Sequence, residues 1–514
     1  MVKNKYLSNS SIIPVPLRLK VKKGYFVLDS KTNIYCDLSF QNLGYYLRDL
    51  LKPATGFDLS IKLLTEMETR KNSITLKLNN GSKHIPTEGY KLMVTPDKIE
   101  IECRNSKGLF YGIQTLRQLF PSEIESSQQV SIDWNIPCVM IEDSPRFSWR
   151  GFMLDEARHF FGKQEVKKIL DMMALLKFNT FHWHLTDNQG WRIEIKNFPL
   201  LIEIGSKRKS TRLFLNRRKS DGRPYMGYYS QEDLREIVAY AKERYIKVIP
   251  EIDIPGHISA ALAAYPELAC NRASFEVSTQ IGILPEVLCV GKESVFNFIE
   301  SIFKEIIDMF PSDLIHIGGD EVLTKRWKEC ELCQKRLITE NLNSERELQT
   351  YFSNRISKFL ENNGKRVIMW NDILDNNIKD SIIGQYWIED INQVIEQIKN
   401  DRKMIMSEME SVYFDHGYNR TSLSKSYNYD PIPKLGGIKY DKDILGIEAC
   451  LWTELILNDK DLEYKLFPRL IAISENAWSL KQNKDFLPFE ARLTQFKKRM
   501  DYLNIRYAEQ DEWF

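Results

Sequence analysis

Beyond Pro145, short hydrophobic runs alternate with longer segments whose hydrophobic positions recur at the spacing of a helix. Residues 164–177, 231–244 and 295–310 are typical of amphipathic helices. The short runs are hydrophobic almost throughout, as are strands buried on both faces of a parallel sheet. There are eight of them: 151–155, 180–185, 247–253, 314–318, 366–370, 382–387, 403–407 and 444–452. Eight strand–helix units predict a (β/α)8 TIM barrel with insertions. Two doubly wound domains are the alternative, but no glycine-rich phosphate loop follows an early strand.

The first 143 residues have a different pattern. Residues 74–78 and 99–103 alternate hydrophobic and polar positions as half-buried strands do, and 108–119 has helical spacing. We therefore predict a small α/β domain over residues 1–143, followed by the barrel with a C-terminal helix over 144–514. Residues 136–145 contain Pro137 and Pro145, and because proline breaks helices and β ladders we expect a linker there.

A barrel predicts where the chemistry lies, because barrel enzymes build their active sites at the C-terminal ends of the strands. In this chain, polar and aromatic residues follow nearly every hydrophobic run. They are Asp155, His184, Asp187, Asp253, His257, Asp320, Glu321, Trp370, Trp387, Tyr413, Asp415, Trp452 and Glu454. Residues with purely structural roles would not be expected to sort in this way, so the pattern predicts a site at the barrel mouth.

The composition excludes several kinds of partner. The 72 Lys and Arg residues nearly balance the 70 Asp and Glu residues, so nothing indicates binding to nucleic acid or to an acidic membrane surface. No hydrophobic run is long enough to span a membrane, and the first ten residues lack the apolar core of a secretory signal. We expect a soluble protein, cytoplasmic as the chain reads, or periplasmic or secreted if this is a processed form.

Eight cysteines are scattered along the chain. Cys330 and Cys333 have the spacing of a zinc-binding or redox pair, but no second Cys or His pair stands nearby in the sequence to complete a tetrahedral site. Cys270 and Cys289 flank a loop and could form a disulfide. Because the sequence shows no complete set of metal ligands, we expect no metal.

One stretch, His316-Ile317-Gly318-Gly319-Asp320-Glu321, joins the end of a strand to two glycines and two adjacent carboxylates. Carboxylates combined with tryptophans at strand ends favour a glycosidase, because aromatic rings pack on sugar faces and an acid protonates the leaving oxygen. A metal-dependent hydrolase is one alternative, since His182 and His184 resemble a ligand pair, but it would need histidines at later strand ends. A non-catalytic sugar-binding barrel is another.

The same stretch resembles the signature of the β-N-acetylhexosaminidases of glycoside hydrolase family 20. Segments similar to family sequences surround it in the family order: 149–155, 158–161, 182–192, 250–257 and 446–454. Residues 1–143 resemble the small α/β domain that precedes these barrels. The resemblance implies an exo-acting enzyme that hydrolyses terminal β-linked N-acetylglucosamine, with N-acetylgalactosamine as a second candidate sugar. A disaccharide-releasing relative with a roomier pocket is the alternative within the family.

The resemblance also implies substrate-assisted hydrolysis with retention, in which the substrate's 2-acetamido oxygen attacks the anomeric carbon. Glu321 would be the general acid, with a pKa raised by apolar walls and a nearby anion. Asp320 would accept the acetamido N–H, and Tyr413 would donate to the acetamido oxygen. Asp187 and His257 would form a relay behind the acid. Adjacent carboxylates suit this scheme, since they cannot easily flank a glycosidic bond from opposite faces.

The remaining roles carried over from the family concern the sugar. Three tryptophans would wall the pocket: Trp370, Trp387 and Trp452. Arg150 and Glu454 would hold ring hydroxyls, because an arginine–carboxylate pair offers donors and acceptors in fixed geometry. Asp415 would contact the far hydroxyls. No cofactor is implied, and the partners are the oligosaccharide or glycoconjugate substrate and, as a candidate, a second copy in a homodimer. Asn188 departs from the family, whose members often carry aspartate there.

Overall fold

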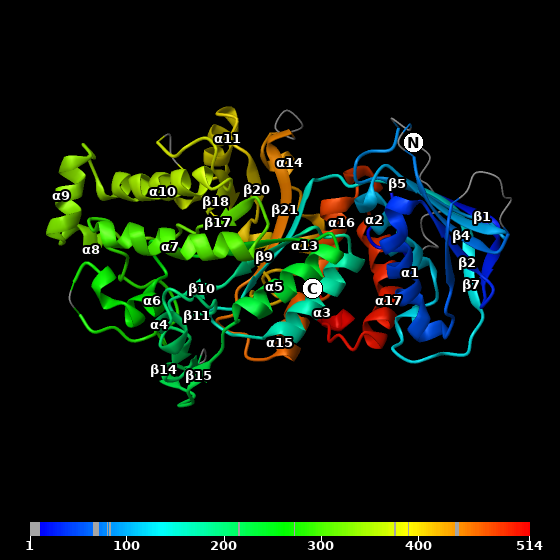
Figure 1. Cartoon of the computed structure of the whole chain (residues 1–514), viewed down its shortest axis with the longest axis horizontal. Coiled ribbons are helices and arrows are strands. Elements are labelled where there is room, and N and C mark those ends of the chain that lie inside the picture. Colours follow the sequence, from blue (N-terminus) through cyan, green and yellow to red (C-terminus); the bar gives the residue numbers. More distant parts are fainter. Residues whose placement is uncertain are drawn as a thin grey trace.

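The computed structural model describes residues 11–64, 71–79, 81, 84–213, 216–271, 273–374, 377–388, 390–436 and 442–513. The first ten residues, on which the expectation about a secretory signal rests, lie outside this part of the chain. A sheet with two helices forms one end of the molecule, and a barrel with its surrounding helices forms the rest (Figure 1). None of the helices among the described residues is long and apolar enough to cross a membrane.

The N-terminal sheet has seven strands in the order β1-β7-β5-β6-β4-β2-β3. Their bounds are β1 Arg18–Leu28, β2 Asn33–Cys36, β3 Ser60–Leu63, β4 Ser73–Leu78, β5 Tyr90–Val94, β6 Lys98–Cys103 and β7 Trp134–Asp143. Helices α1 (Gln41–Thr55) and α2 (Ser106–Leu119) lie between this sheet and the barrel (Figure 1). The two strands and the helix predicted in this region are confirmed.

The linker predicted at residues 136–145 is wrong for most of its length, because β7 occupies residues 134–143 and pairs with both β1 and β5. Pro137 lies opposite Tyr25 of β1, whereas β5 pairs with β7 only from Met140 to Asp143. Pro137 therefore lies beyond the end of β5. Its missing N–H costs no ladder hydrogen bond on that side, which is where a strand tolerates proline.

The predicted barrel is confirmed: eight parallel strands close in the order β16-β17-β18-β19-β20-β21-β8-β9. They are β8 Trp149–Asp155, β9 Thr180–His184, β16 Lys247–Glu251, β17 Leu314–His316, β18 Arg366–Trp370, β19 Ile383–Tyr386, β20 Met404–Met406 and β21 Ile444–Leu451. The outer helices include α3 Lys163–Leu175, α5 Gln231–Glu243, α7 Glu293–Met309, α10 Glu345–Asn362, α11 Ile391–Lys399, α16 Arg469–Trp478 and α17 Phe486–Tyr502.

Side chains fill the inside of the barrel in layers. Six hydrophobic residues from six strands pack together: Trp149, Ile249, Leu314, Ile368, Ile383 and Ile405. A buried polar layer includes Glu251, whose carboxylate lies 3.0 Å from both His182 and His316. Both histidines considered as metal ligands contact barrel carboxylates, since His182 lies 2.8 Å from Glu448 and His184 lies 2.6 Å from Glu251. These charges raise the pKa of His182 to about 9 despite its burial.

Candidate active site

A pocket of about 230 Å³ opens at the C-terminal ends of the barrel strands. It is lined by Arg158, His257, Gly282, Ile283, Asp320, Glu321, Trp370, Trp387, Met409, Tyr413, Asp415, His416, Trp452 and Glu454. Of the residues to which the family resemblance gave a role, Asp187 and Arg150 are the two that are not part of this lining. Asp187 lies directly behind His257, whereas Arg150 is remote. The barrel thus brings together residues as far apart in the chain as Arg158 and Glu454, as strand ends do in this fold.

Two glycines turn the chain from β17 into the pocket. Gly318 and Gly319 have φ of +65° and +96°, and a Cβ on Gly318 would lie 1.8 Å from Oδ1 of Asp253. Glu321 also has a positive φ of 51°, which is unfavourable for a residue with a side chain. Its backbone N–H donates to Oδ1 of Asp372 over 3.2 Å. Such a conformation persists where the surroundings over-determine it, as commonly happens at active sites.

A chain of charged groups leads from the barrel interior to Glu321. Oδ1 of Asp187 lies 3.2 Å from Nδ1 of His257, and Nε2 of His257 lies 3.5 Å from Oε2 of Glu321. The same Nε2 lies 3.8 Å from Oδ2 of Asp320. Burial opposes the charged imidazolium, but Asp187 and Asp253 outweigh it and raise the pKa of His257 well above its usual range. His257 therefore carries a positive charge beside both pocket carboxylates.

Asp187 is held in its anionic form. Burial alone would favour the protonated acid, but Arg158 and His257 keep the pKa of Asp187 well below its usual range. Nη2 of Arg158 lies 2.9 Å from Oδ2 of Asp187, and Nε2 of His184 lies 3.1 Å from the same oxygen. The next residue, Asn188, accepts at Oδ1 from the hydroxyl of Ser259 over 2.8 Å, which ties this loop to the one that carries His257.

The charge on His257 predicts a particular pH dependence of stability. Since its folded pKa is raised above about 6.5, its contribution is complete below about pH 6.5 and is lost as pH rises through the folded pKa. We expect the free energy of unfolding lost in His257→Gln to be largest below about pH 6.5 and to shrink in alkaline solution. Urea unfolding of both proteins over a pH series measures this, and a loss that grows with pH would contradict it.

Asp320 is the buried carboxyl group of the pocket. It is 9% exposed, and its Oδ1 is buried with no hydrogen-bond partner among the described residues. Burial, together with the charges of Asp253 and Asp372, raises the pKa of Asp320 well above its usual range. An unpaired buried acceptor is costly, so this oxygen is suited to receive a donor from a ligand.

Aromatic rings form the walls around Asp320. Trp370 and Trp452 have ring centroids 5.8 Å apart, while Trp387 and Tyr413 stack at 6.2 Å with an interplanar angle of 14°. Two of the indoles are fixed by carboxylates: Trp370 donates to Glu251 over 2.9 Å, and Trp387 donates to Asp372 over 2.7 Å. Because the indole N–H groups are satisfied, the rings are held as rigid apolar faces, which suits the faces of a sugar.

Comparisons with known proteins agree with this geometry. The family model for the catalytic domain of glycosyl hydrolase family 20 matches residues 147–481, and the model for domain 2 of that family matches residues 9–144. The chain belongs to glycosyl hydrolase family 20.

Two relatives and one solved structure illustrate the likeness. The chain is 38% identical to a β-hexosaminidase of Porphyromonas gingivalis over 98% of this chain but only 65% of that protein, so it spans slightly less than two thirds of that relative. It is 34% identical to a β-hexosaminidase of Akkermansia muciniphila, covering 81% of this chain and 85% of the relative. The family 20 β-N-acetylhexosaminidase of Streptomyces coelicolor A3(2) has a TM-score of 0.85 at 31% identity, covering 98% of both chains.

The structure does not bring Arg150 to the pocket of this family 20 chain. Arg150 is the second residue of β8, at the opposite end of the strand from the barrel mouth. Its buried guanidinium donates to Glu88 over 2.8 Å and to the hydroxyl of Tyr111 over 2.9 Å. Both partners belong to the N-terminal region, so Arg150 ties that region to the barrel. The prediction that Arg150 holds the sugar is therefore wrong.

Arg158 is the arginine that lines the pocket. It follows the C-terminal end of β8, and its guanidinium carbon lies 5.0 Å from the ring centroid of Trp452. Nη1 lies 3.1 Å from Oδ2 of Asp155, in addition to the contact with Asp187. The sequence contained a signal for this residue. Arg158 comes after the C-terminal end of the strand predicted at residues 151–155, whereas Arg150 comes before the start of that strand.

These two arginines make a matched pair of substitutions. We expect Arg150→Ala to lower the free energy of unfolding by about 3 kcal/mol, because it removes one partner of a buried ion pair, and to leave KM nearly unchanged. Arg158→Ala should raise KM for an aryl glycoside by about tenfold or more, as loss of charge-assisted hydrogen bonds to a sugar would. Urea unfolding and initial rates measure both. A KM defect in Arg150→Ala at normal stability would contradict the assignment.

Asp372 is a second residue of the site that was not among those predicted from the sequence. It lies in the short helix η5 (Asn371–Ile373) directly after β18 and holds both the Glu321 backbone and the Trp387 ring. Asp372 lies two residues beyond Trp370, the last residue of β18. The expectation that residues at the C-terminal ends of strands form the site therefore applies to Asp372 as well. Gly282 and Ile283, which also line the pocket, come from a loop with no such signal.

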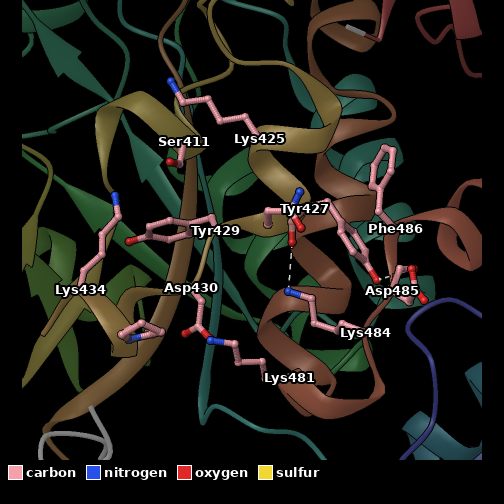
Figure 2. Close-up of a pocket in the computed structure, with 12 residues that line it drawn as sticks. Ser411, Lys425, Tyr427, Tyr429, Asp430, Lys434, Lys481, Lys484, Asp485 and Phe486 are labelled. Carbon is pink, nitrogen blue, oxygen red and sulfur yellow. Dashed lines mark hydrogen bonds and ion pairs between the residues drawn. The ribbon is translucent and has the colours of Figure 1, made fainter. Parts of the chain in front are cut away.

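A larger pocket, of about 570 Å³, lies elsewhere on the barrel of the family 20 chain. Figure 2 shows four lysines around it: Lys425, Lys434, Lys481 and Lys484. Each lysine already contacts a carboxylate or a backbone carbonyl. Asp430 in its wall pairs with Arg146, which precedes β8, so this pocket lies toward the N-terminal ends of the strands. It contains none of the predicted site residues.

Proposed function

We propose that this chain is a retaining, exo-acting β-N-acetylhexosaminidase that removes terminal β-linked N-acetylglucosamine from oligosaccharides or glycoconjugates. The observation that carries the proposal is the unpaired, buried Oδ1 of Asp320 in an aromatic-walled pocket. A carboxylate at a polar rim can bind an ordinary sugar hydroxyl. A buried carboxyl group surrounded by tryptophans better suits an acetamido group, because its N–H donates a hydrogen bond while its methyl group packs against the aromatic rings. The names of the relatives support the same substrate class.

In the proposed reaction, Asp320 accepts a hydrogen bond from the acetamido N–H and turns the acetamido oxygen toward the anomeric carbon. That oxygen forms a bond to the carbon as the glycosidic bond breaks, while Glu321 gives its proton to the leaving oxygen. The resulting oxazolinium ion carries a positive charge that the Asp320 carboxylate offsets. Water, deprotonated by Glu321, then attacks the anomeric carbon and opens the ring with net retention.

The neighbouring groups suit these steps. His257 carries a positive charge 3.5 Å from Glu321 and 3.8 Å from Asp320, which stabilises Glu321 as the anion that remains after proton donation. Tyr413 is 4% exposed and lines the same pocket; burial raises its pKa well above the usual range. Its hydroxyl therefore keeps its proton and serves as a donor to the acetamido oxygen.

Exo-action is supported by the charged residues that share the pocket with Glu321. Arg158, Asp415 and Glu454 line the same small pocket and offer donors and acceptors to ring hydroxyls. Burial raises the pKa of Asp415 to about 6, so it is largely anionic at neutral pH and disfavours a terminal sugar with a negative group there. A disaccharide-releasing enzyme would need a roomier pocket than this one.

A pair of aryl glycosides tests the proposal. Aryl β-N-acetylglucosaminide should be hydrolysed, and the matched 2-deoxy glycoside, which lacks the acetamido group, should be inert because it brings no nucleophile. Ready cleavage of the 2-deoxy substrate would favour an enzymic nucleophile instead. Activity on lacto-N-biosides alone would favour the disaccharide-releasing alternative, and binding without turnover would favour a non-catalytic barrel.

A further inference from the structure

Four cysteines from two separate loops meet in the structure. The Sγ atom of Cys333 lies 3.8 Å from that of Cys270 and 3.6 Å from that of Cys289, which in turn lies 3.6 Å from Sγ of Cys330. All four sulfur atoms lie within 4.8 Å of one another. The other four cysteines of the chain lie in strands β2, β6, β7 and β21. In the sequence no second pair stands near Cys330 and Cys333, and the fold supplies one in Cys270 and Cys289.

We propose that Cys270, Cys289, Cys330 and Cys333 bind one structural Zn²⁺ ion. Zn–S bonds of about 2.3 Å at tetrahedral angles place neighbouring sulfur atoms about 3.8 Å apart, close to the separations seen here. An all-sulfur tetrahedral set selects zinc or iron. Because the four sulfurs lie so close together, they enclose a single ion rather than a cluster with one cysteine on each iron.

The local backbone favours thiolates at this point. Cys330 is the N-cap of α9 (Glu331–Thr339) and Cys333 lies in its first turn, so the positive end of the helix faces the sulfurs. Gly291 packs on this turn, where a Cβ would lie 2.3 Å from the backbone carbon of Leu332 and 2.5 Å from the nitrogen of Cys333.

One cation is held beside the cluster. Nζ of Lys292 donates to the carbonyl oxygens of Glu267 and Ala269 over 2.8 and 2.6 Å, and Ala269 immediately precedes Cys270. Four thiols release four protons on binding Zn²⁺, which leaves a net charge of about −2 on the centre. The charge of Lys292 offsets part of it.

The proposed ion would fasten together the two loops that carry the acid–base residues. Cys270 and Cys289 lie in the connection from β16 to α7, which also carries His257 and the pocket-lining Gly282 and Ile283. Cys330 and Cys333 lie in the connection from β17 to α10, which carries Asp320 and Glu321. Helices α8 (Lys325–Lys328) and α9 lie at the end of the molecule remote from the N-terminal sheet (Figure 1).

The metal content of the full chain tests the proposed zinc site without any use of substrate. Protein expressed with added zinc, then reduced and desalted, should contain about one zinc per chain by elemental mass spectrometry. X-ray absorption should give a shell of sulfur atoms alone at about 2.3 Å. The double variant Cys330→Ser/Cys333→Ser should lose the metal and melt at a lower temperature. Cys36→Ser, at another buried thiol, is the matched control and should keep the metal.

Several results would overturn the proposal. Zinc well below one per chain in the wild type would do so, as would iron in its place or zinc that persists in the double variant. A Cys270–Cys289 disulfide, found by peptide mapping after alkylation of the folded protein, would also exclude the site. If the double variant does not fold, alkylation of the folded wild-type protein still tests the zinc site. Adding a chelator should increase the number of alkylated thiols by four. An unchanged number of alkylated thiols would exclude the ion. These readouts do not depend on hexosaminidase activity, so the two proposals can fail separately.

Discussion

Replacing Glu321 by glutamine should lower kcat/KM on a β-N-acetylglucosaminide with a poor leaving group by about a thousandfold, within the range for removal of a general acid–base group. The glutamine side chain has nearly the shape of the acid but cannot transfer a proton. The leaving oxygen would then depart as an unprotonated alkoxide. The loss should be smaller for a dinitrophenyl glycoside, because that leaving group needs little protonation. Initial rates on the two substrates measure both parts.

The dependence on leaving group separates an acid role from a structural one. A variant that was merely misfolded would lose activity equally on both substrates. Glu329→Gln is a matched control, since Glu329 lies further along the same loop with its side chain 57% exposed, and it should retain activity on both. Near-normal turnover by Glu321→Gln on the poor leaving group would exclude Glu321 as the proton donor.

The barrel could be predicted because its strands are short and buried over nearly their whole length. All five residues of β9 and all seven of β8 are buried, so hydrophobic runs mark them without any need for periodicity. The position of the site followed from the same runs, since the barrel gathers strand ends at one mouth. Asp320, Glu321, Trp370 and Trp452 were placed correctly at that mouth by this argument, from residues that are far apart in the sequence.

Contacts between distant segments could not be predicted in this way. The contacts of Arg150 with Glu88 and Tyr111 join segments more than 35 residues apart, so no local pattern showed that this arginine ties the N-terminal region to the barrel. Cys289 and Cys330 are separated by the whole of α7 and β17, so no local spacing joins them. Pro137 signalled a break, yet β7 continues through it because β5 ends before that point.

Replacing Asp320 by asparagine should remove activity and yet stabilise the folded protein. The asparagine side chain can still accept a hydrogen bond from the acetamido N–H, but it carries no charge to offset the oxazolinium ion. We therefore expect kcat to fall by about a hundredfold or more, as when one electrostatic contact to a charged intermediate is removed. KM should change less. Steady-state kinetics on aryl β-N-acetylglucosaminide measure the effect.

The gain in stability follows from the raised pKa of Asp320. Since the unfolded chain releases this proton near about pH 4 and the folded protein holds it to a higher pH, the wild type loses stability as pH rises between the two values. An asparagine side chain cannot ionise, so Asp320→Asn should melt at a higher temperature than wild type at neutral pH and at about the same temperature near about pH 3. Asp97→Asn, whose side chain is 65% exposed, should change neither property. A lower melting temperature in Asp320→Asn at neutral pH would mean that the carboxylate stabilises the fold. In that case Asp320 would have stabilising partners in the free protein, which contradicts the proposal that a bound acetamido group and its developing positive charge are what stabilise this acid.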